Sequence, residues 1–178
     1  RGALVAEVHF DKSLDELIYQ VLNDEIPGSI WAMRAMALRF PIHQKTAQTF
    51  SDILSKEYFW GLKAEATFLL GKLLTPEAEG VVLKALKSSD FRVRKAAVLA
   101  LRNFRKDFAK KTLENVIGKD KHSGVVGTAI VSLAHTDPTG SKDFIRSQLN
   151  RPAWYEEIDL ACLNAFEIIG DQRLVSDI

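Results

Sequence analysis

The sequence predicts an all-α protein, a solenoid of about five stacked helix pairs, and two observations predict it. Apolar pairs four residues apart recur at steps of 31 or 32 residues: Ile18/Leu22, Phe50/Leu54, Val82/Leu86, Leu113/Ile117 and Ile145/Leu149. A second series lies between them, at steps of 29 to 33 residues: Met33/Ala37, Leu62/Ala66, Val93/Ala97, Val125/Ala129 and Ile158/Cys162. Residues four apart share one helix face. Each repeat is therefore expected to hold two amphipathic helices that bury their apolar faces by stacking on neighbouring repeats.

The helix limits follow from these two series. The first helix of each pair is expected at residues 14–23, 43–55, 76–87, 108–117 and 139–149. The second helix is expected at residues 30–40, 60–71, 91–103, 123–134 and 156–169. A helical-repeat domain over 14–178 then contains repeats 14–40, 43–71, 76–103, 108–134 and 139–169, followed by the start of a further helix at 171–178.

Capping residues agree with these limits. Candidate N-caps stand at Ser13 (with Glu16 as a capping box), Thr75, Asp90, Asp107 and Asp137, and prolines follow Thr75 and Asp137. Glycines at Gly71 and Gly170 mark the ends of second helices. The second series also keeps a small residue at one position, ending in Cys162, so two helices can approach closely there and the thiol is expected to be buried and unreactive.

One repeat carries a family resemblance. Residues 90–101 read DFRVRKAAVLAL, which resembles the HEAT consensus: an Asp and a Val-Arg open the second helix, and alanines follow. The fourth repeat departs from this pattern, because residues 122–127 (HSGVVG) lack both the Asp and the Arg. The resemblance implies a HEAT-like α-α superhelix.

The first thirteen residues follow a different pattern. Apolar residues alternate from Leu4 to Phe10, which is the period of a β-strand. We expect residues 1–13 to form an extended, strand-like tail, either the end of a preceding β domain or a segment lying on the first repeat. The chain starts at Arg1 rather than Met, so we expect a fragment of a longer protein.

The junction after this tail resembles zinc aminopeptidases of the aminopeptidase N type. The similar segments are residues 8–20 (VHFDKSLDELIYQ) and 30–36 (IWAMRAM). The resemblance implies a non-catalytic C-terminal domain that packs on the upstream catalytic and β-sandwich domains of the same polypeptide and shapes peptide access. Zinc would be held in that catalytic domain, by His-Glu-x-x-His and a later Glu. A peptide substrate or another protein would be a further partner.

The residues of this chain predict no catalytic, metal or cofactor site. The four histidines are His9, His43, His122 and His135, and none belongs to a His-Glu-x-x-His motif. His135 stands at the end of a second helix, where the dipole favours an imidazolium. No apolar run is long enough for a membrane span, so we expect no membrane partner. No targeting segment is evident, which leaves a cytoplasmic, periplasmic or extracellular location open.

Charge is uneven along the chain. The net charge is +1, yet residues 84–121 carry +8. The candidate interaction surface in this zone consists of Arg92, Arg94, Lys95, Arg102, Arg105 and Lys106. Binding to a nucleic-acid backbone is disfavoured against an ordinary solvated helix surface, because the chain as a whole is not basic. Arg34, Lys63 and Arg94 share one repeat position, where we expect a structural ladder of ion pairs with acids such as Asp24 and Asp90.

Two further functions stay open. One is a free-standing HEAT-repeat scaffold that holds a protein partner on the face of the second helices. The other is a nucleic-acid binder that works through residues 84–121, whose affinity would fall steeply as salt rises.

Overall fold

The computed structural model describes residues 12–73, 75–149 and 156–170. The strand expected within residues 1–13 and the further helix expected at 171–178 lie outside the described residues, except for Lys12 and Ser13. The chain forms two compact units, residues 1–100 and residues 101–178, and each has its own set of packed helices.

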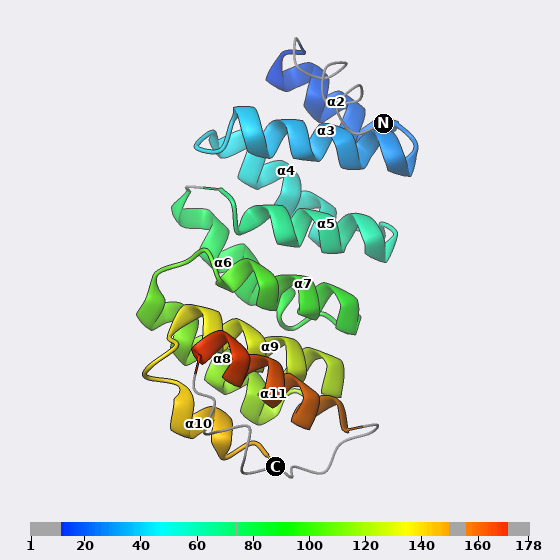
Figure 1. Ribbon diagram of the computed structural model, residues 1–178. Helices are drawn as coiled ribbons and strands as arrows, with labels where there is room; N and C mark the ends of the chain where they lie inside the picture. Colours follow the sequence, from blue (N-terminus) through cyan, green and yellow to red (C-terminus); the bar gives the residue numbers. More distant parts are fainter. Residues whose placement is uncertain (1–11, 74, 150–155, 171–178) are drawn as a thin grey trace. The chain divides into compact units, whose positions relative to one another are not determined.

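Unit 1 is built from paired helices in order of sequence. Its helices are α2 (Leu14–Asn23), α3 (Ile26–Arg39), α4 (Gln44–Ser55), α5 (Trp60–Leu70), α6 (Pro76–Ala85) and α7 (Phe91–Leu101), of which α7 ends at the unit boundary. Helix α2 packs on α3 and α4 packs on α5, while α3 contacts α5 and α4 contacts α6. Within this unit the second helices α3 and α5 lie side by side (Figure 1), as stacked repeats require.

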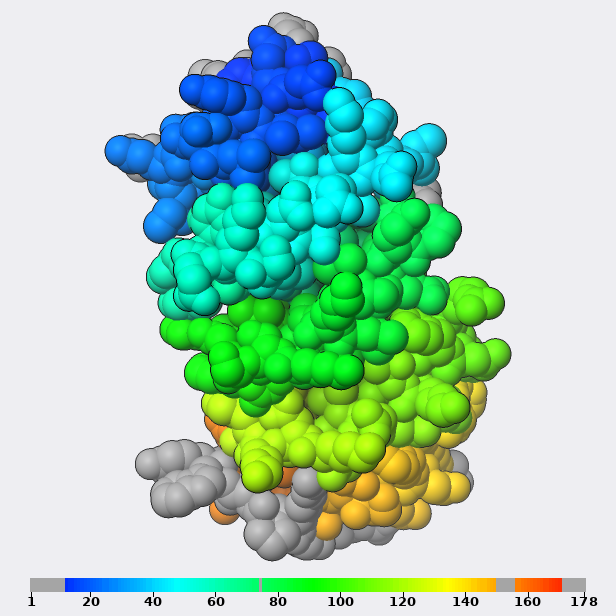
Figure 2. Space-filling view, turned by 180° about the vertical axis from the view of Figure 1, so that it is seen from behind, coloured from blue at the N-terminus to red at the C-terminus, as the bar shows by residue number. Residues whose placement is uncertain are grey.

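The opposite face of unit 1 shows the same order. In Figure 2 its segments follow one another from blue through cyan to green, so neighbours in space are neighbours in sequence. Because neighbouring repeats stack on each other, each repeat covers the apolar face of the next, and a short repeat can bury its apolar residues.

Unit 2 contains α8 (Lys106–Lys119), α9 (Ser123–Thr136), α10 (Lys142–Arg146) and α11 (Glu157–Ile169). Helix α9 is the centre of this unit, because it packs against both α8 and α11. The short α10 contacts α9 and α11.

The predicted fold class, an all-α solenoid of helix pairs, is confirmed. The small residues of the second series are all buried: Ala37, Ala66, Ala97, Ala129 and Cys162. Their apolar partners one turn earlier, from Met33 to Ile158, are buried as well. The capping box of Ser13 and Glu16 is present, and Gly170 ends α11 in the left-handed conformation, with φ 75°.

The phase of the first helix was predicted wrongly. The buried pair is Leu17 and Val21, whereas Leu22 is exposed. The inner repeats share part of this shift: Ile53 and Ala85 are buried, whereas Leu54 and Leu86, the predicted second members, are half-buried.

The first helix of the fifth repeat is also shorter than predicted. It spans Lys142–Arg146 instead of residues 139–149. Asp137 does not cap a helix at Pro138; its carboxylate accepts the amide of Gly140 and the ammonium groups of Lys106 and Lys110. The Ser141 hydroxyl donates to the Asp137 carbonyl at 2.6 Å, and this turn delays the start of the helix.

Two further caps differ from prediction. Helix α8 begins at Lys106, so Asp107 lies in its first turn and Arg105 is the N-cap. Thr75 is the N-cap of α6, but its hydroxyl caps no amide, and this buried oxygen has no hydrogen-bond partner among the described residues. Asp90 does accept the amide of Arg92 at 2.8 Å, as a cap should.

Glycine permits close helix approach at one position in each unit. A Cβ on Gly71 would lie 2.7 Å from the Cα and carbonyl oxygen of Ala100, so the end of α5 meets the backbone of α7 there. A Cβ on Gly127 of α9 would lie 3.2 Å from the Cβ of Ala161 on α11. Both distances are shorter than ordinary van der Waals contact, so a larger residue would push these helices apart.

Candidate functional site

A groove opens between α3 and α5 on the side of the second helices in unit 1. We call it the α3–α5 groove; its volume is about 710 Å³. Its walls mix apolar and charged side chains, chiefly Arg34, Ala37, Leu38, Glu65, Phe68 and Lys72. Ala37, the small residue of the second series in the first repeat, is one of the lining residues.

Leu38 is the unusual member of this groove. Its side chain is 77% exposed although it lies near the end of a well-formed helix. Ala37 and Leu69, which also line the groove, are buried. Leu38 therefore presents an apolar side chain in the groove that no described residue covers.

Charged groups are fixed at the rim of the α3–α5 groove. The Arg34 guanidinium donates to the Glu65 carboxylate at 2.6 Å, and this hydrogen bond raises the pKa of Arg34. The same guanidinium lies 5.3 Å from the ring of Trp31, and Lys72 lies 5.0 Å from the ring of Phe68. These contacts hold long side chains in place around Leu38, so a ligand would lose less side-chain entropy on binding.

A second hollow in unit 1 is strongly basic. We call it the lysine pocket; its volume is about 250 Å³. Its polar wall consists of Lys63, Lys84, Lys87, Ser51, Ser55 and Ser88. Its apolar wall consists of Leu54, Val81, Ala85 and Val93. The three ammonium groups form no hydrogen bond or ion pair with any described residue.

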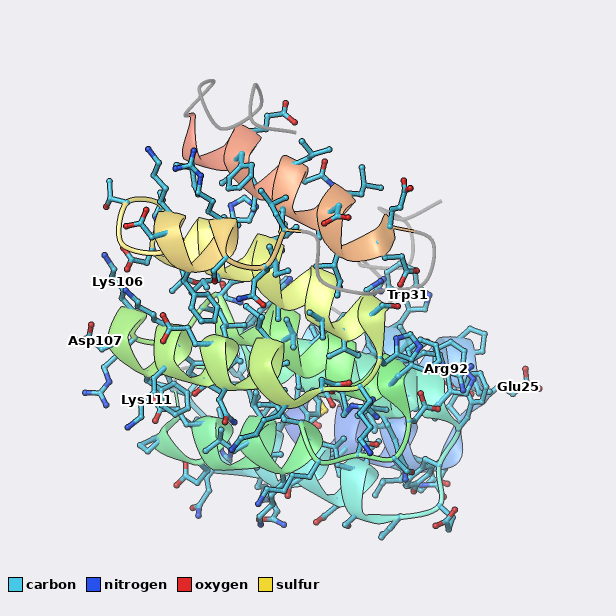
Figure 3. The ribbon with its side chains drawn as sticks, turned by 90° about the horizontal axis from the view of Figure 1, so that it is seen from below. Glu25, Trp31, Arg92, Lys106, Asp107 and Lys111 are labelled. Carbon is cyan, nitrogen blue, oxygen red and sulfur yellow. The ribbon has the colours of Figure 1, made fainter. Side chains whose placement is uncertain are left out.

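Arginine and aromatic side chains share one edge of unit 1. Arg92 forms an ion pair with Asp90 at 2.7 Å and its guanidinium lies 3.8 Å from the ring centre of Trp60. Figure 3 shows Arg92 at the same edge of this unit as Trp31 and Glu25. The hydrogen bond from Arg92 holds the pKa of Asp90 below its ordinary value. Arg92 is thus occupied by contacts within its own unit.

The six predicted interaction residues do not form one site in the structure. Arg92, Arg94 and Lys95 belong to unit 1, and Arg102, Arg105 and Lys106 belong to unit 2. Arg94 donates to the carbonyls of Ser88 and Ser89. Arg102 donates to the Ser132 hydroxyl at 2.9 Å, and Lys106 pairs with Asp137 at 2.8 Å. Much of the predicted basic zone is therefore engaged inside the fold.

The three residues expected to form a ladder have three different environments. Arg34 pairs with Glu65 of the next repeat, whereas Arg94 binds backbone carbonyls before its own helix. Lys63 lines the lysine pocket together with Lys84 and Lys87. Sequence reasoning placed Lys84 and Lys87 in the basic zone but did not connect them with Lys63, since that lysine comes from the preceding repeat.

A buried carboxylate, that of Asp137, links two elements of unit 2. Asp137 accepts from Lys106 and from Lys110, each at 2.8 Å, and these two bonds together with the Gly140 amide hold the pKa of Asp137 well below its ordinary value. Figure 3 shows Lys106 together with Asp107 and Lys111 at one edge of this unit. Asp137 has a structural role, because both of its carboxylate oxygens already accept hydrogen bonds from within the fold.

His135 was predicted to favour the imidazolium form, and the structure indicates the opposite. Partial burial and the positive charge of Arg102 lower the pKa of His135. Burial of the ring, and after it the positive charge of Arg102, therefore outweigh the favourable end of the helix dipole.

Cys162 is buried, and desolvation together with Asp159 raises its pKa to about 12, so no reactive thiolate forms at neutral pH. Within residues 12–73, 75–149 and 156–170, no three His, Cys, Asp or Glu side chains gather as metal ligands would. No helix in the described part of the chain has the length and apolar character to cross a membrane.

Comparison with known proteins supports the repeat assignment. Residues 47–134 match the family model of HEAT repeats, a span that runs from α4 to α9. This span is a HEAT-repeat region. A search of curated proteins finds no match to the chain.

Proposed function

We propose that this chain is a non-catalytic binding scaffold whose repeats hold a polypeptide segment in the α3–α5 groove. The observation that carries the proposal is Leu38, an apolar side chain 77% exposed in a groove that Ala37, Phe68 and Leu69 also line. Fully burying a leucine contributes roughly 1.5–3 kcal/mol. A partner that covers Leu38 therefore gains an anchor that the isolated chain leaves in water.

The surroundings of Leu38 suit a protein partner. Binding surfaces commonly have an apolar centre with polar groups at the rim, and here Arg34, Glu65 and Lys72 supply the rim. Because Arg34 and Glu65 already pair with each other, they can guide a partner without a large desolvation cost. A helix or extended segment with an apolar side chain fits such a groove between two helices.

The test is a selection of peptides that bind the full chain, followed by a comparison of two variants. Leu38→Asp places a charge on the groove, whereas Leu160→Asp makes the same change at another exposed leucine, on α11 of unit 2. We expect Leu38→Asp to weaken binding of the selected peptides at least tenfold, and Leu160→Asp to leave it unchanged. Equal affinities for the two variants would refute the groove as the binding site.

A finer proposal is that the scaffold is the C-terminal domain of a zinc aminopeptidase-like protein. The proposal is supported by the resemblance in residues 8–20 and by the hydrogen bonds that the described part of this segment forms with the first helix pair. Lys12 Nζ donates to Gln20 Oε1 at 2.7 Å, and Arg39 donates to the Lys12 carbonyl at 2.6 Å. These contacts fix the start of the repeats to the first helix pair, as a junction between two packed domains requires.

In that proposal the partner is the catalytic part of the same polypeptide, which would hold the zinc. Reading the coding frame on the N-terminal side of Arg1 tests it. His-Glu-x-x-His with a later Glu, in frame, supports the proposal; a start codon directly before Arg1 contradicts it and leaves the scaffold proposal standing.

A further inference from the structure

The lysine pocket brings together three cations that the fold itself does not neutralise. Lys63 comes from α5, Lys84 from the last turn of α6, and Lys87 from the residues that follow it. No carboxylate lines the pocket. The C-terminal carbonyls of α6 favour nearby cations, which explains how the lysines tolerate one another without a carboxylate.

The remaining wall of the pocket suits an oxyanion. Ser51, Ser55 and Ser88 supply hydroxyl groups beside the ammonium groups. The Ser88 hydroxyl accepts the Asp90 amide at 3.3 Å, which positions this hydroxyl and leaves its proton for an oxyanion. The Ser55 hydroxyl donates its proton to the Asp52 carbonyl, so Ser55 lines the pocket without a donor for the ligand. Ammonium and hydroxyl donors around one hollow are the groups that bind phosphate oxygens.

The size and floor of the pocket restrict the ligand further. A volume of about 250 Å³ fits one anionic group with a short stem, and Leu54, Val81 and Val93 offer that stem an apolar wall. A nucleic-acid backbone instead needs a row of cations that meets successive phosphates. The neighbouring Arg92 and Arg94 do not extend the pocket into such a row, because they bind Asp90 and the carbonyls of Ser88 and Ser89.

We propose that the lysine pocket binds a phosphorylated side chain of a polypeptide partner. The dianionic phosphate would take its hydrogen bonds from Lys63, Lys84 and Lys87, and the carbon stem would lie on the apolar wall. This site is separate from the α3–α5 groove and does not require that groove to be occupied.

The test uses the full chain and a short peptide with one phosphoserine, with its unphosphorylated form as the first control. Binding is followed by NMR of labelled lysine side chains. We expect the phosphopeptide to shift the signals of Lys63, Lys84 and Lys87 saturably, and the unphosphorylated peptide to leave them in place. Equal binding of both peptides, or no saturable shift, would overturn the proposal.

Variants separate the pocket from general surface charge. Lys87→Met should weaken phosphopeptide binding about tenfold or more, because one charge-assisted hydrogen bond is lost. Lys95→Met is the matched control: it removes an exposed lysine of α7 outside the pocket and should change the affinity less than twofold. Equal losses in the two variants would show attraction to overall charge and contradict a built site.

A single-stranded oligonucleotide serves as the competing ligand. We expect it to displace the phosphopeptide only weakly. If the oligonucleotide displaces the bound phosphopeptide at a lower concentration than unlabelled phosphopeptide does, the assignment to a polypeptide is overturned. A nucleic-acid backbone is then the favoured ligand.

Discussion

Asp137 connects the turn before α10 with the first turns of α8. Replacing it with Asn removes the charge that pairs with Lys106 and Lys110, while the shape of the side chain is kept. We expect Asp137→Asn to lower the free energy of unfolding by about 1–3 kcal/mol, since hydrogen bonds to charged groups contribute that much. Urea unfolding at pH 7 measures it. Asp107→Asn, at an exposed carboxylate in the first turn of α8, should change it by about 0.5 kcal/mol or less.

The same carboxylate predicts a dependence on pH. The pKa of Asp137 is lower in the folded protein than its ordinary value of about 3.9. Its contribution to stability is therefore complete above about pH 4 and is lost as the pH falls through the folded pKa. The difference between wild type and Asp137→Asn should shrink below pH 4; a difference that stays constant to pH 2.5 would contradict this role.

Arg102 and His135 give a second prediction at the scale of the residue. The charge of Arg102 contributes to the lowered pKa of His135, after partial burial. Arg102→Met should raise the pKa of His135 toward its ordinary value, measured by the pH titration of its ring signals. Arg105→Met, which removes an exposed arginine at the start of α8, should leave that pKa where it is in the wild type.

At the scale of the element, two glycines in unit 1 should respond to the same substitution in opposite ways. Gly71→Ala places a Cβ 2.7 Å from the backbone of Ala100, so α5 and α7 must separate, and we expect a loss of about 1–3 kcal/mol in the free energy of unfolding. Gly80→Ala adds a methyl group to the interior of α6 with nothing within 4 Å. It should stabilise the protein by about 0.5–1 kcal/mol. Thermal unfolding of both variants measures the contrast.

The periodic elements could be predicted from the sequence because each helix obeys a local rule. In the second helices buried residues recur every four positions, as at Met33 and Ala37, and the limits of α2, α5 and α9 lie within two residues of expectation. The shortened α10 could not be predicted this way. Its start depends on Asp137, whose partners Lys106 and Lys110 belong to the preceding repeat.

The candidate sites were harder to predict, because they too combine residues from different repeats. The lysine pocket joins Lys63 with Lys84 and Lys87, and nothing in the spacing of these residues along the chain connects them. Leu38 did leave a signal in the sequence. It is an apolar residue of α3 that lies outside both i, i+4 series, and an apolar residue out of phase is a candidate for exposure.

At the scale of the whole molecule, a repeat protein is stabilised by contacts between neighbours. Phe50 is fully buried in α4, a helix that packs on α5 and α6. We expect Phe50→Ala to cost about 3–5 kcal/mol. Hydrogen exchange should become faster in α4, α5 and α6, while amides of α9 and α11 keep their wild-type rates. Uniformly faster exchange in all helices would contradict a stack of semi-independent repeats.

The central claim is that these repeats act by holding a polypeptide segment in the α3–α5 groove. The most direct measurement is methyl NMR of the full chain, titrated with a peptide selected for binding. We expect the largest shifts at Leu38 and Leu69 and little change at Leu160 of α11. Shifts that leave Leu38 unchanged and gather elsewhere would contradict the claim.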